Sequence, residues 1–583
     1  MSAYEPPLAE IGFLLNRVTG LEEVLACPPY AHLDAEVVVA VLEQAGRFTA
    51  TVLGPLNASG DAEGSRLVDG RVVTPAGFRQ AYQAFADGGW IGLDLPESHG
   101  GQQMPRAVQI AVAEMVNGAC VSFGMLPLMQ RAAAKVLIAH AEPWLASICV
   151  PRVVSGRWGA TISMSEAQAG SDVGRARTRA EPRADGSYAI TGTKIFITYG
   201  DQDLTENIVH VVLARTPGAP AGVKGLSLFA VPRLTFSKAG DIDAPNAVSI
   251  SRVEEKMGLK ASPTCVVDFD GAVGWRIGGE GEGLKNIFTM VNTMRLEVSV
   301  QGVAVAAAAT RCAFAYAHER PQGGPPERPA VMIAEHPDVR RMLMTMRTRT
   351  DAMRALVYET ARLLDLGEAH PDAKRRAEAQ ALAEWLLPVC KACGSETGFD
   401  VANLAVQVFG GHGYVKDAGV EQYVRDSRVM AIYEGANGIQ AIDLVTRRLA
   451  RDGGAAFRLF ARRVTADMAA ATGRSDLTGL AGGLGAALVA AERTSAWMIE
   501  RLTTAPRDAL AGATAYLQLI GAVATAWMSL RLALAAGPGT SEHDGKRASA
   551  AFHAAALLPL AQAYAAQATA GASTLDVLPG AGV

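Results

Sequence analysis

The chain is 583 residues long, with 49% apolar and 19% charged residues, and 54 Lys and Arg against 58 Asp and Glu give a net charge of −4. This near-neutral charge removes the electrostatic attraction on which nucleic-acid binding depends, and the apolar content excludes intrinsic disorder. Seven cysteines are too few for a disulfide framework in a chain of this length, so we expect a reducing, cytoplasmic location.

The residue pattern divides the chain into five segments. Residues 1–35 are mixed and contain prolines, which predicts an N-terminal arm. Helical periodicity follows over 36–155, short strand-like runs over 156–275 and helices again over 276–452, and 453–583 form an Ala-rich helical extension. Because the strands form one block, this order predicts a helical domain, a β-barrel or sandwich and an α bundle, and argues against a doubly wound sheet.

The strands are predicted from short runs that are closed by Gly, Pro or Asp. Ile208–Ala214 is β-branched and almost continuously apolar, which is typical of a buried strand. The other predicted strands are Tyr188–Ile190, Lys194–Thr198, Leu226–Val231 and Thr264–Phe269.

Long helices are predicted after the strands, at Leu284–Ala317, Pro337–Leu366 and Ala373–Phe399. The glycines and prolines of Arg320–Pro326 break this region, because Pro removes a backbone donor and Gly lowers helix propensity.

Two stretches of the extension, Ala509–Leu530 and Ala548–Leu575, contain no Asp, Glu, Lys or Arg and are long enough to cross a bilayer. They consist mostly of Ala with Gln, Thr, Ser and Tyr, so they are only weakly hydrophobic. We therefore expect buried helices of a bundle, with membrane contact as the alternative.

Two groups of polar and glycine residues in the β segment are candidates for ligand binding. Ser163–Asp172 is rich in Ser and Gly, which let a backbone approach a ligand closely, although a plain polar turn has the same composition. In Gly192–Thr198, Phe196 and Thr198 are two residues apart and share one face of a strand. They could stack on a flat ring and bond to it, or form part of a core.

Two further groups lie in the last helical region before the extension. Gln407–Tyr414 contains three glycines in four residues, which allows close approach to an anion but equally marks the end of a helix. In Ile432–Gln440, Glu434 stands in an apolar stretch, where burial would raise its pKa toward the range of a general base. A carboxylate that only complements a helix dipole is the alternative. Cys390 and Cys393 have no second cysteine pair, so no metal site is predicted.

In this order and spacing, the four groups together resemble the acyl-CoA dehydrogenase family over residues 36–450. The resemblance rests on Ser165-Glu166 with Gly170-Ser171-Asp172, on Gly192-Thr193-Lys194 with Thr198, on the Gln-x-x-Gly-Gly-x-Gly-Tyr loop at 407–414 and on Tyr433-Glu434-Gly435. Other stretches resemble a branch that has a C-terminal helical extension and includes 3-methylmercaptopropionyl-CoA dehydrogenases: Pro55–Gly64, Gly89-Trp90, Glu255–Gly258, Ser262–Cys265 and Gly435–Val445.

The resemblance implies a mainly α fold with a central β domain: an N-terminal helical domain, a β-barrel and a C-terminal four-helix bundle, here followed by an extra helical domain. It also implies FAD bound between the β domain and the bundle, with a neighbouring subunit completing the site. We expect a homo-oligomer, with a dimer favoured, and an electron-transferring flavoprotein as the electron acceptor.

The family's functional residues are carried over position by position. Glu434 is implied as the base. The implied FAD contacts are Met164, Ser165, Gly170, Ser171, Phe196, Thr198 and Asn437 and, toward the neighbour's FAD, Arg320, Gln322, Gln407, Gly410 and Gly411. The implied acyl-CoA contacts are Ser171, Asn292, Arg295, Glu434 and Gly435.

A second family position for the base is excluded here. Some relatives carry the base one residue before the CoA-contacting arginine, and that residue is Met294 in this chain, which cannot accept a proton. Glu297, two positions after Arg295, is expected to face elsewhere on the helix.

The implied reaction is the dehydrogenation of an acyl-CoA thioester to the trans-2-enoyl-CoA, with removal of the α-proton by Glu434 and transfer of the β-hydride to flavin N5. An acyl-CoA oxidase that uses O2 and a non-catalytic binding protein with the same fold are the alternatives. The acyl group is open. Gly323 and the Pro-rich 324–329 stretch replace the family's usual Phe-Gly, which puts the approach of Arg320 to a neighbour's FAD in doubt.

Overall fold

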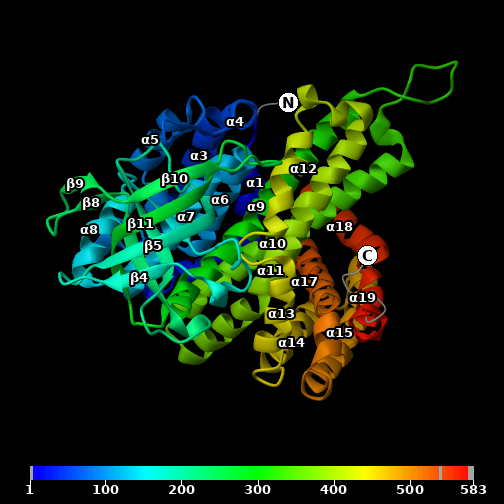
Figure 1. Ribbon diagram of the computed structural model, residues 1–583. Coiled ribbons are helices and arrows are strands. Elements are labelled where there is room, and N and C mark those ends of the chain that lie inside the picture. Colours follow the sequence, from blue (N-terminus) through cyan, green and yellow to red (C-terminus); the bar gives the residue numbers. More distant parts are fainter. Residues whose placement is uncertain (1–3, 537–540, 576–583) are drawn as a thin grey trace.

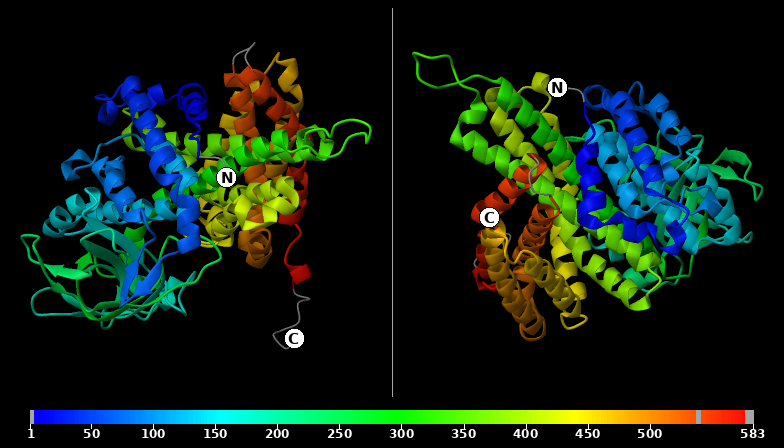
Figure 2. Two further views of the ribbon diagram at one scale, coloured as in Figure 1. Left: turned by 90° about the horizontal axis from the view of Figure 1, so that it is seen from above. Right: turned by 180° about the vertical axis from the view of Figure 1, so that it is seen from behind.

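The computed structural model describes residues 4–536 and 541–575, and its elements form four groups along the chain (Figure 1). The N-terminal helices and the β domain lie together at one end of the molecule. A bundle of long helices forms the middle, and the C-terminal helices pack on the bundle away from the β domain (Figure 2). This arrangement confirms the fold predicted from the sequence.

The N-terminal domain is helical apart from one small hairpin, β1 (Arg66–Val68) and β2 (Arg71–Val73), which was not predicted. Its helices are α1 (Leu8–Phe13), α2 (Leu21–Leu25), α3 (Ala35–Phe48), α4 (Leu56–Glu63), α5 (Phe78–Asp87), α6 (Arg106–Ala119), α7 (Val121–His140) and α8 (Pro143–Val154).

Residues 4–35 differ from the arm that the prolines predicted, because they fold into packed helices. α1 continues as the π-helix Leu14–Thr19, and Ile11, Leu14 and Val24 are buried. Arg17 donates to the carbonyl of Ala535 in the C-terminal extension (3.2 Å). Apolar side chains at helical spacing thus hold this segment against distant parts of the chain.

The β domain is a sheet that partly closes on itself. Its strand order is β10-β11-β5-β4-β6-β3, and β7 pairs with both β11 and β6, which gives the predicted barrel. Two separate predicted strands, Tyr188–Ile190 and Lys194–Thr198, are one strand. The strands are β3 (Trp158–Ser163), β4 (Arg179–Pro182), β5 (Tyr188–Thr198), β6 (Asn207–Arg215), β7 (Leu226–Pro232), β8 (Leu234–Phe236), β9 (Ile242–Pro245), β10 (Val248–Val253) and β11 (Thr264–Ile277).

The bundle is built from α9 (Gly283–Glu319), α10 (Pro337–Ala369) and α11 (Ala373–Phe409), followed by the short helices α12 (Glu421–Ser427) and α13 (Asn437–Asp443). α11 runs on past Phe399, where the predicted helix ended. Residues 320–332, between α9 and α10, form an exposed hairpin that projects well beyond the rest of the molecule (Figures 1 and 2).

The extension packs against the bundle through α17, which lies beside α10 and α11. Its helices are α14 (Ala455–Ala470), α15 (Thr478–Thr504), α16 (Pro506–Ala511), α17 (Ala513–Ala535), α18 (Ser541–Phe552) and α19 (Leu560–Ala568).

Three described helices, α7, α9 and α17, are long and apolar enough to cross a membrane, and α3 with α4 would add a fourth if that bent pair were one span. Between 72% and 89% of the apolar window of α7, α9 and α17 is buried against other elements, as expected for bundle helices.

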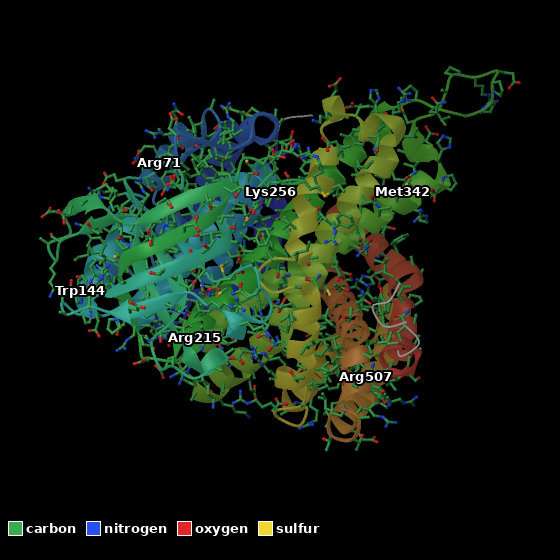
Figure 3. The ribbon with its side chains drawn as sticks, viewed as in Figure 1. Arg71, Trp144, Arg215, Lys256, Met342 and Arg507 are labelled. Carbon is green, nitrogen blue, oxygen red and sulfur yellow. The ribbon has the colours of Figure 1, made fainter. Side chains whose placement is uncertain are left out.

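Buried ion pairs join the domains. Arg131 of α7 pairs with Glu297 of α9 (2.6 Å), so Glu297 faces the N-terminal domain. Arg71 of β2 pairs with the buried Asp201 of the β domain (2.8 Å), and Figure 3 shows Arg71 at this junction. Lys256, also labelled there, lies where the β domain meets the bundle.

Candidate active site

Glu434 lies in the turn between the 3-10 helix Arg428–Ala431 and α13. Its φ is 53° and that of Gly435 is 86°, so two successive residues adopt the left-handed conformation, which is strained for a glutamate. The buried Gln440 of α13 donates to the carbonyls of Glu434 (3.5 Å) and Gly435 (3.1 Å). Strained residues held by their surroundings cluster at functional sites.

The environment of Glu434 suits a general base. Burial raises the pKa of Glu434 to about 7, and the ammonium of Lys391 on α11 opposes this rise. The pKa is therefore close to neutral pH, where a carboxyl can both lose and accept a proton. Lys391 was not among the predicted site residues, because a single Lys within a helical pattern does not indicate burial.

The two predicted flavin segments are joined by a buried ion pair. Lys194 of β5 is fully buried, and its Nζ contacts Glu166 Oε1 (2.7 Å) and donates to the carbonyl of Met164 (3.1 Å). The N–H of Ile195 donates to the carbonyl of Ser165 (2.9 Å). Burial alone would raise the pKa of Glu166, but Lys194 and the surrounding donors lower it to about 2.

A bulge at the end of β5 exposes an aromatic ring. β5 changes register against β11 between Cys265 and Val267, and Phe196, at this step, has a φ of 59° and is 63% exposed. Ile197 is buried in the β-domain core. Phe196, before it, is exposed, and Thr198, after it, is half-buried.

α7 brings the end of β5 and the Glu434 turn together. Tyr199, next to Thr198, donates its hydroxyl to the carbonyl of Ser122 (2.9 Å). Tyr433, next to Glu434, donates its hydroxyl to Gln301 Oε1 of α9 (2.5 Å) and also contacts Met125 Sδ (3.8 Å). Ser122 and Met125 are one turn apart on α7, so both parts of the predicted site meet at the same short stretch of helix. Ser122 and Met125 were not predicted to have this role, since both are ordinary helix residues.

Two of the predicted substrate residues, Asn292 and Arg295, lie on α9. Asn292 is half-buried and Gly435 is exposed. Arg295, expected to contact the substrate, is buried and its Nη1 is paired with Asp443 Oδ2 (2.7 Å). The guanidinium of Arg295 is therefore bonded inside the fold, and Arg447 and Arg448 also contact Asp443 (3.4 and 3.7 Å). Met294 is also buried.

The side chain of Asn437 is not free for a flavin either. Its amide is bonded to α11, with Oδ1 accepting from Lys391 Nζ (3.0 Å) and Nδ2 donating to Glu396 Oε1 (3.1 Å). Only its backbone remains for the predicted cofactor contact, because α11 and α13 pack with these polar groups facing each other.

The remaining predicted cofactor residues gather at the far end of the bundle. The rings of Tyr316 and Phe409 stack with centroids 4.1 Å apart, which holds the C-terminal ends of α9 and α11 together. Along α11, Gly410 is about 28 Å from Lys391 at 1.5 Å per residue. This second group, well separated from Glu434 in one chain, comprises Arg320, Gln322, Gln407, Gly410 and Gly411, all exposed.

Ser171 and Gly170, in the loop after β3, are exposed as well. Neither Cys390 nor Cys393 takes part in a cluster: Cys390 is buried against Thr360 (3.2 Å), and the described residues contain no group of three His, Cys, Asp or Glu side chains placed to bind a metal.

Models of protein families match the chain in four consecutive stretches. The N-terminal, middle and C-terminal domains of acyl-CoA dehydrogenases match residues 39–157, 161–272 and 281–450. A family described as acetyl-CoA dehydrogenase C-terminal like matches residues 460–578.

Individual relatives cover nearly the whole chain. A 3-methylmercaptopropionyl-CoA dehydrogenase of Ruegeria pomeroyi is 42% identical over 541 residues, 91% of each chain. A broad-specificity linear acyl-CoA dehydrogenase, FadE5, of Mycobacterium tuberculosis is 33% identical over 605 residues, 96% of each chain. The crystal structure of Caenorhabditis elegans ACDH-11 with C11-CoA has the same fold, with a TM-score of 0.79 at 21% identity, covering 96% of this chain and 93% of that one. The resemblance is thereby confirmed, and the chain is an enzyme of the acyl-CoA dehydrogenase family with an additional C-terminal helical domain.

Proposed function

We propose that this enzyme uses FAD to dehydrogenate an acyl-CoA thioester between its α and β carbons, with Glu434 as the base. The observation that carries the proposal is the meeting of Tyr199 and Tyr433 on one turn of α7, which supports one site formed by the end of β5 and the Glu434 turn.

The residues present fit FAD. A Cβ added at Gly170, Gly410 or Gly411 would meet nothing within 4 Å, so there is open space beside these backbones. Phe196 offers an exposed ring next to the hydroxyl of Thr198. We assign the flavin side to Met164, Ser165, Gly170, Ser171, Phe196 and Thr198. When bound, FAD would accept the β-hydrogen as a hydride, and we propose an electron-transferring flavoprotein as the final acceptor.

The second group of residues is assigned to the FAD of a second subunit. Arg320 and Gln322 lie in the projecting hairpin, and Gln407, Gly410 and Gly411 lie beside its base at the end of α11. About 28 Å of helix separates Gly410 from Lys391. The residues at the end of α11 and the residues around Glu434 therefore do not contact the same FAD within one chain. A homodimer with the hairpins exchanged supplies both groups to each site.

Glu434 removes the α-proton. That proton is weakly acidic, so its removal requires hydrogen-bond donors where negative charge develops on the thioester oxygen. Within the described residues the N–H of Glu434 donates no hydrogen bond, and the family resemblance assigns the donor role to this group. A pKa near 7 lets Glu434 accept the proton at neutral pH. Asn292, half-buried on α9, is placed as a contact for the CoA part.

The acyl group is proposed from relatives. 3-Methylmercaptopropionyl-CoA is the first substrate to test because the relative that bears this name is 42% identical. FadE5, described as acting broadly on linear acyl-CoAs, makes straight chains the second set.

The proposal is tested by mixing purified enzyme with 3-methylmercaptopropionyl-CoA and with straight-chain acyl-CoAs of increasing length in the absence of O2. Bleaching of the flavin spectrum with formation of the enoyl-CoA is expected, and Glu434→Gln should bind the same thioesters without bleaching. Rapid reoxidation by O2 would instead identify an oxidase. A colourless protein that binds no flavin would overturn the proposal in favour of a binding protein.

A cytoplasmic location is also proposed. All seven cysteines are free thiols, and six of them are buried, which suits a reducing compartment. Cell fractionation tests this location, and recovery outside the cytoplasm would contradict it.

A further inference from the structure

A buried polar network lies directly beneath the base turn. Its centre is the amide of Asn437, the first residue of α13 and three positions after Glu434. Asn437 Oδ1 accepts from Lys391 Nζ (3.0 Å) and from Ser395 Oγ (3.2 Å). Its Nδ2 donates to Glu396 Oε1 (3.1 Å). Lys391 lies one turn before the adjacent Ser395 and Glu396 on α11, so this helix holds the start of α13 through the side chain of Asn437.

This network controls where the base turn lies. α13 begins after Ala436, which offers no side-chain cap, so its start is anchored by the bonds of Asn437 to α11. Glu434 and Gly435 both have positive φ, and a strained turn keeps its conformation only when its surroundings determine it. Gln440 holds the carbonyls on one side, and Asn437 ties the turn to α11 on the other.

Lys391 also supplies the positive charge of this region. It is fully buried, and within the described residues its ammonium makes no ion pair within 4 Å. Burial lowers the pKa of Lys391 to about 8, and Glu434 and Glu396 oppose this fall, so Lys391 is mostly an ammonium at neutral pH. The other cation nearby, Arg295 of α9, is paired with Asp443 of α13 (2.7 Å), and Arg447 and Arg448 also contact this carboxylate. Glu396 of α11 accepts a hydrogen bond from Asn437, and burial raises the pKa of this carboxyl. Tyr433 stays neutral because burial raises its pKa.

We propose that Lys391 is the positioning residue for the base: it holds the Glu434 turn on α11 through Asn437, and its ammonium keeps the Glu434 carboxylate ionised before the thioester arrives. This inference rests on the proposed function of Glu434. A buried cation close to the carboxylate but not bonded to it favours ionisation while leaving the carboxylate oxygens available to the substrate.

The experiment measures proton abstraction alone. The α-hydrogens of a 3-thiaacyl-CoA exchange with D2O when a base removes them, and the sulfur at the β position has no hydride to transfer. Exchange is followed by mass spectrometry between about pH 6 and 9. The variants are Lys391→Met, which removes the charge at similar length, Lys391→Arg, which keeps it, and Asn437→Ala, which removes the link. Lys374→Met, an exposed Lys on the same helix, is the matched control.

The exchange rate should rise with pH as Glu434 ionises; this rising part of the profile is its acid limb. In Lys391→Met we expect the acid limb to move to higher pH by about one unit. At a pH below the limb the exchange rate should fall about tenfold, and raising the pH should restore part of it. Lys391→Arg should return the limb toward that of the wild type. Asn437→Ala should lower exchange about tenfold at every pH without moving the limb. Lys374→Met should match the wild type.

A Lys391→Met protein with the wild-type limb and plateau would overturn the assignment of charge, and an unchanged plateau in Asn437→Ala would overturn the positioning role. Asn437→Ala keeps the inference testable if Lys391→Met does not fold. Full exchange by Glu434→Gln, or none by the wild type, would overturn the proposed function. Exchange that Glu434→Gln abolishes but neither Lys391→Met nor Asn437→Ala alters would overturn only this inference.

Discussion

Tyr199 and Tyr433 reach the same turn of α7 from two different domains, one from the end of a β-strand and the other from the bundle. Each is the direct neighbour of a residue assigned to the chemistry, Thr198 or Glu434. A buried helix of the N-terminal domain therefore lies between the proposed flavin side and the proposed base, and it contacts the two tyrosines through Ser122 and Met125.

The pH dependence of turnover should follow Glu434. Its pKa is raised to about 7 by burial, with Lys391 opposing the rise, and only the ionised carboxylate can accept a proton. kcat/KM should therefore rise with pH, about tenfold per unit below pH 7, and level off above it. Steady-state assays with a fixed acyl-CoA check this, and a flat profile from acid to neutral pH would contradict the role of Glu434.

Breaking the ion pair between Lys194 and Glu166 should destabilise the protein strongly. Lys194→Met leaves Glu166 as a buried charge without its cation, which costs about 3–5 kcal/mol of unfolding free energy. Denaturant unfolding of the FAD-free protein measures this loss. The exposed pair between Arg175 and Asp172 is the control, because Arg175→Met should cost less than about 1 kcal/mol. Equal losses of unfolding free energy in Lys194→Met and Arg175→Met would contradict the structural role of the buried pair.

The same pair gives a stability that depends on acid pH. The pKa of Glu166 falls from an ordinary 4.5 to about 2 in the folded protein. Its contribution is therefore fully present above pH 4.5 and is lost as pH falls toward 2. The difference in unfolding free energy between wild type and Glu166→Gln should be constant above that window and shrink within it. A difference that grows on acidification would have the wrong sign.

Phe196 should matter for the cofactor and not for the fold. A non-glycine residue at φ 59° costs about 1–2 kcal/mol, so Phe196→Gly should leave unfolding stability unchanged or slightly raised. Loss of ring stacking should weaken FAD binding about tenfold. Phe196→Leu, which keeps a β-carbon but loses the ring, should weaken FAD binding without a gain in stability. Unchanged FAD affinity in both variants, measured by fluorescence titration, would remove Phe196 from the flavin site.

The exchange of hairpins between subunits can be tested with mixed dimers. Arg320→Ala and Glu434→Gln are each expected to impair every site in their own homodimers. In a mixed dimer, the site with the intact Glu434 receives Arg320 from the other subunit, so co-expression should restore about a quarter of wild-type activity. If Arg320 serves the site of its own chain, mixed dimers contain no intact site and activity stays at the level of the parents.

The pH profile of the Lys391 variants tests the base turn, and the mixed dimers test the role of the hairpin. A failed complementation would give the hairpin another role and leave the base turn unaffected, since Gly410, beside the hairpin, is about 28 Å along α11 from Lys391, beside the base turn.

Local pattern in the sequence was enough for much of this protein. The β-branched run at Ile208–Ala214 predicted a buried strand, and this strand is buried along nearly its whole length. An almost continuously apolar run is typical of a strand that is covered on both faces. The order of helices and strands predicted the barrel between two helical parts, and the apolar stretch around Glu434 predicted a base with a raised pKa. The prediction of an N-terminal arm from a mixed, Pro-containing composition was wrong for residues 4–35. These residues pack on α10 and α17, which lie hundreds of residues away in the sequence.

Tertiary structure decided which polar side chains are available for chemistry. Arg295 and Asn437 matched family positions, yet Asp443 and α11 occupy their side chains. Lys391 carried no signal of its own, because a lysine in a helix is normally solvated and only the packing of α13 on α11 buries it beside the base. Composition and spacing report what a segment tends to do alone, whereas the electrostatics of a site depend on charges that only folding brings together.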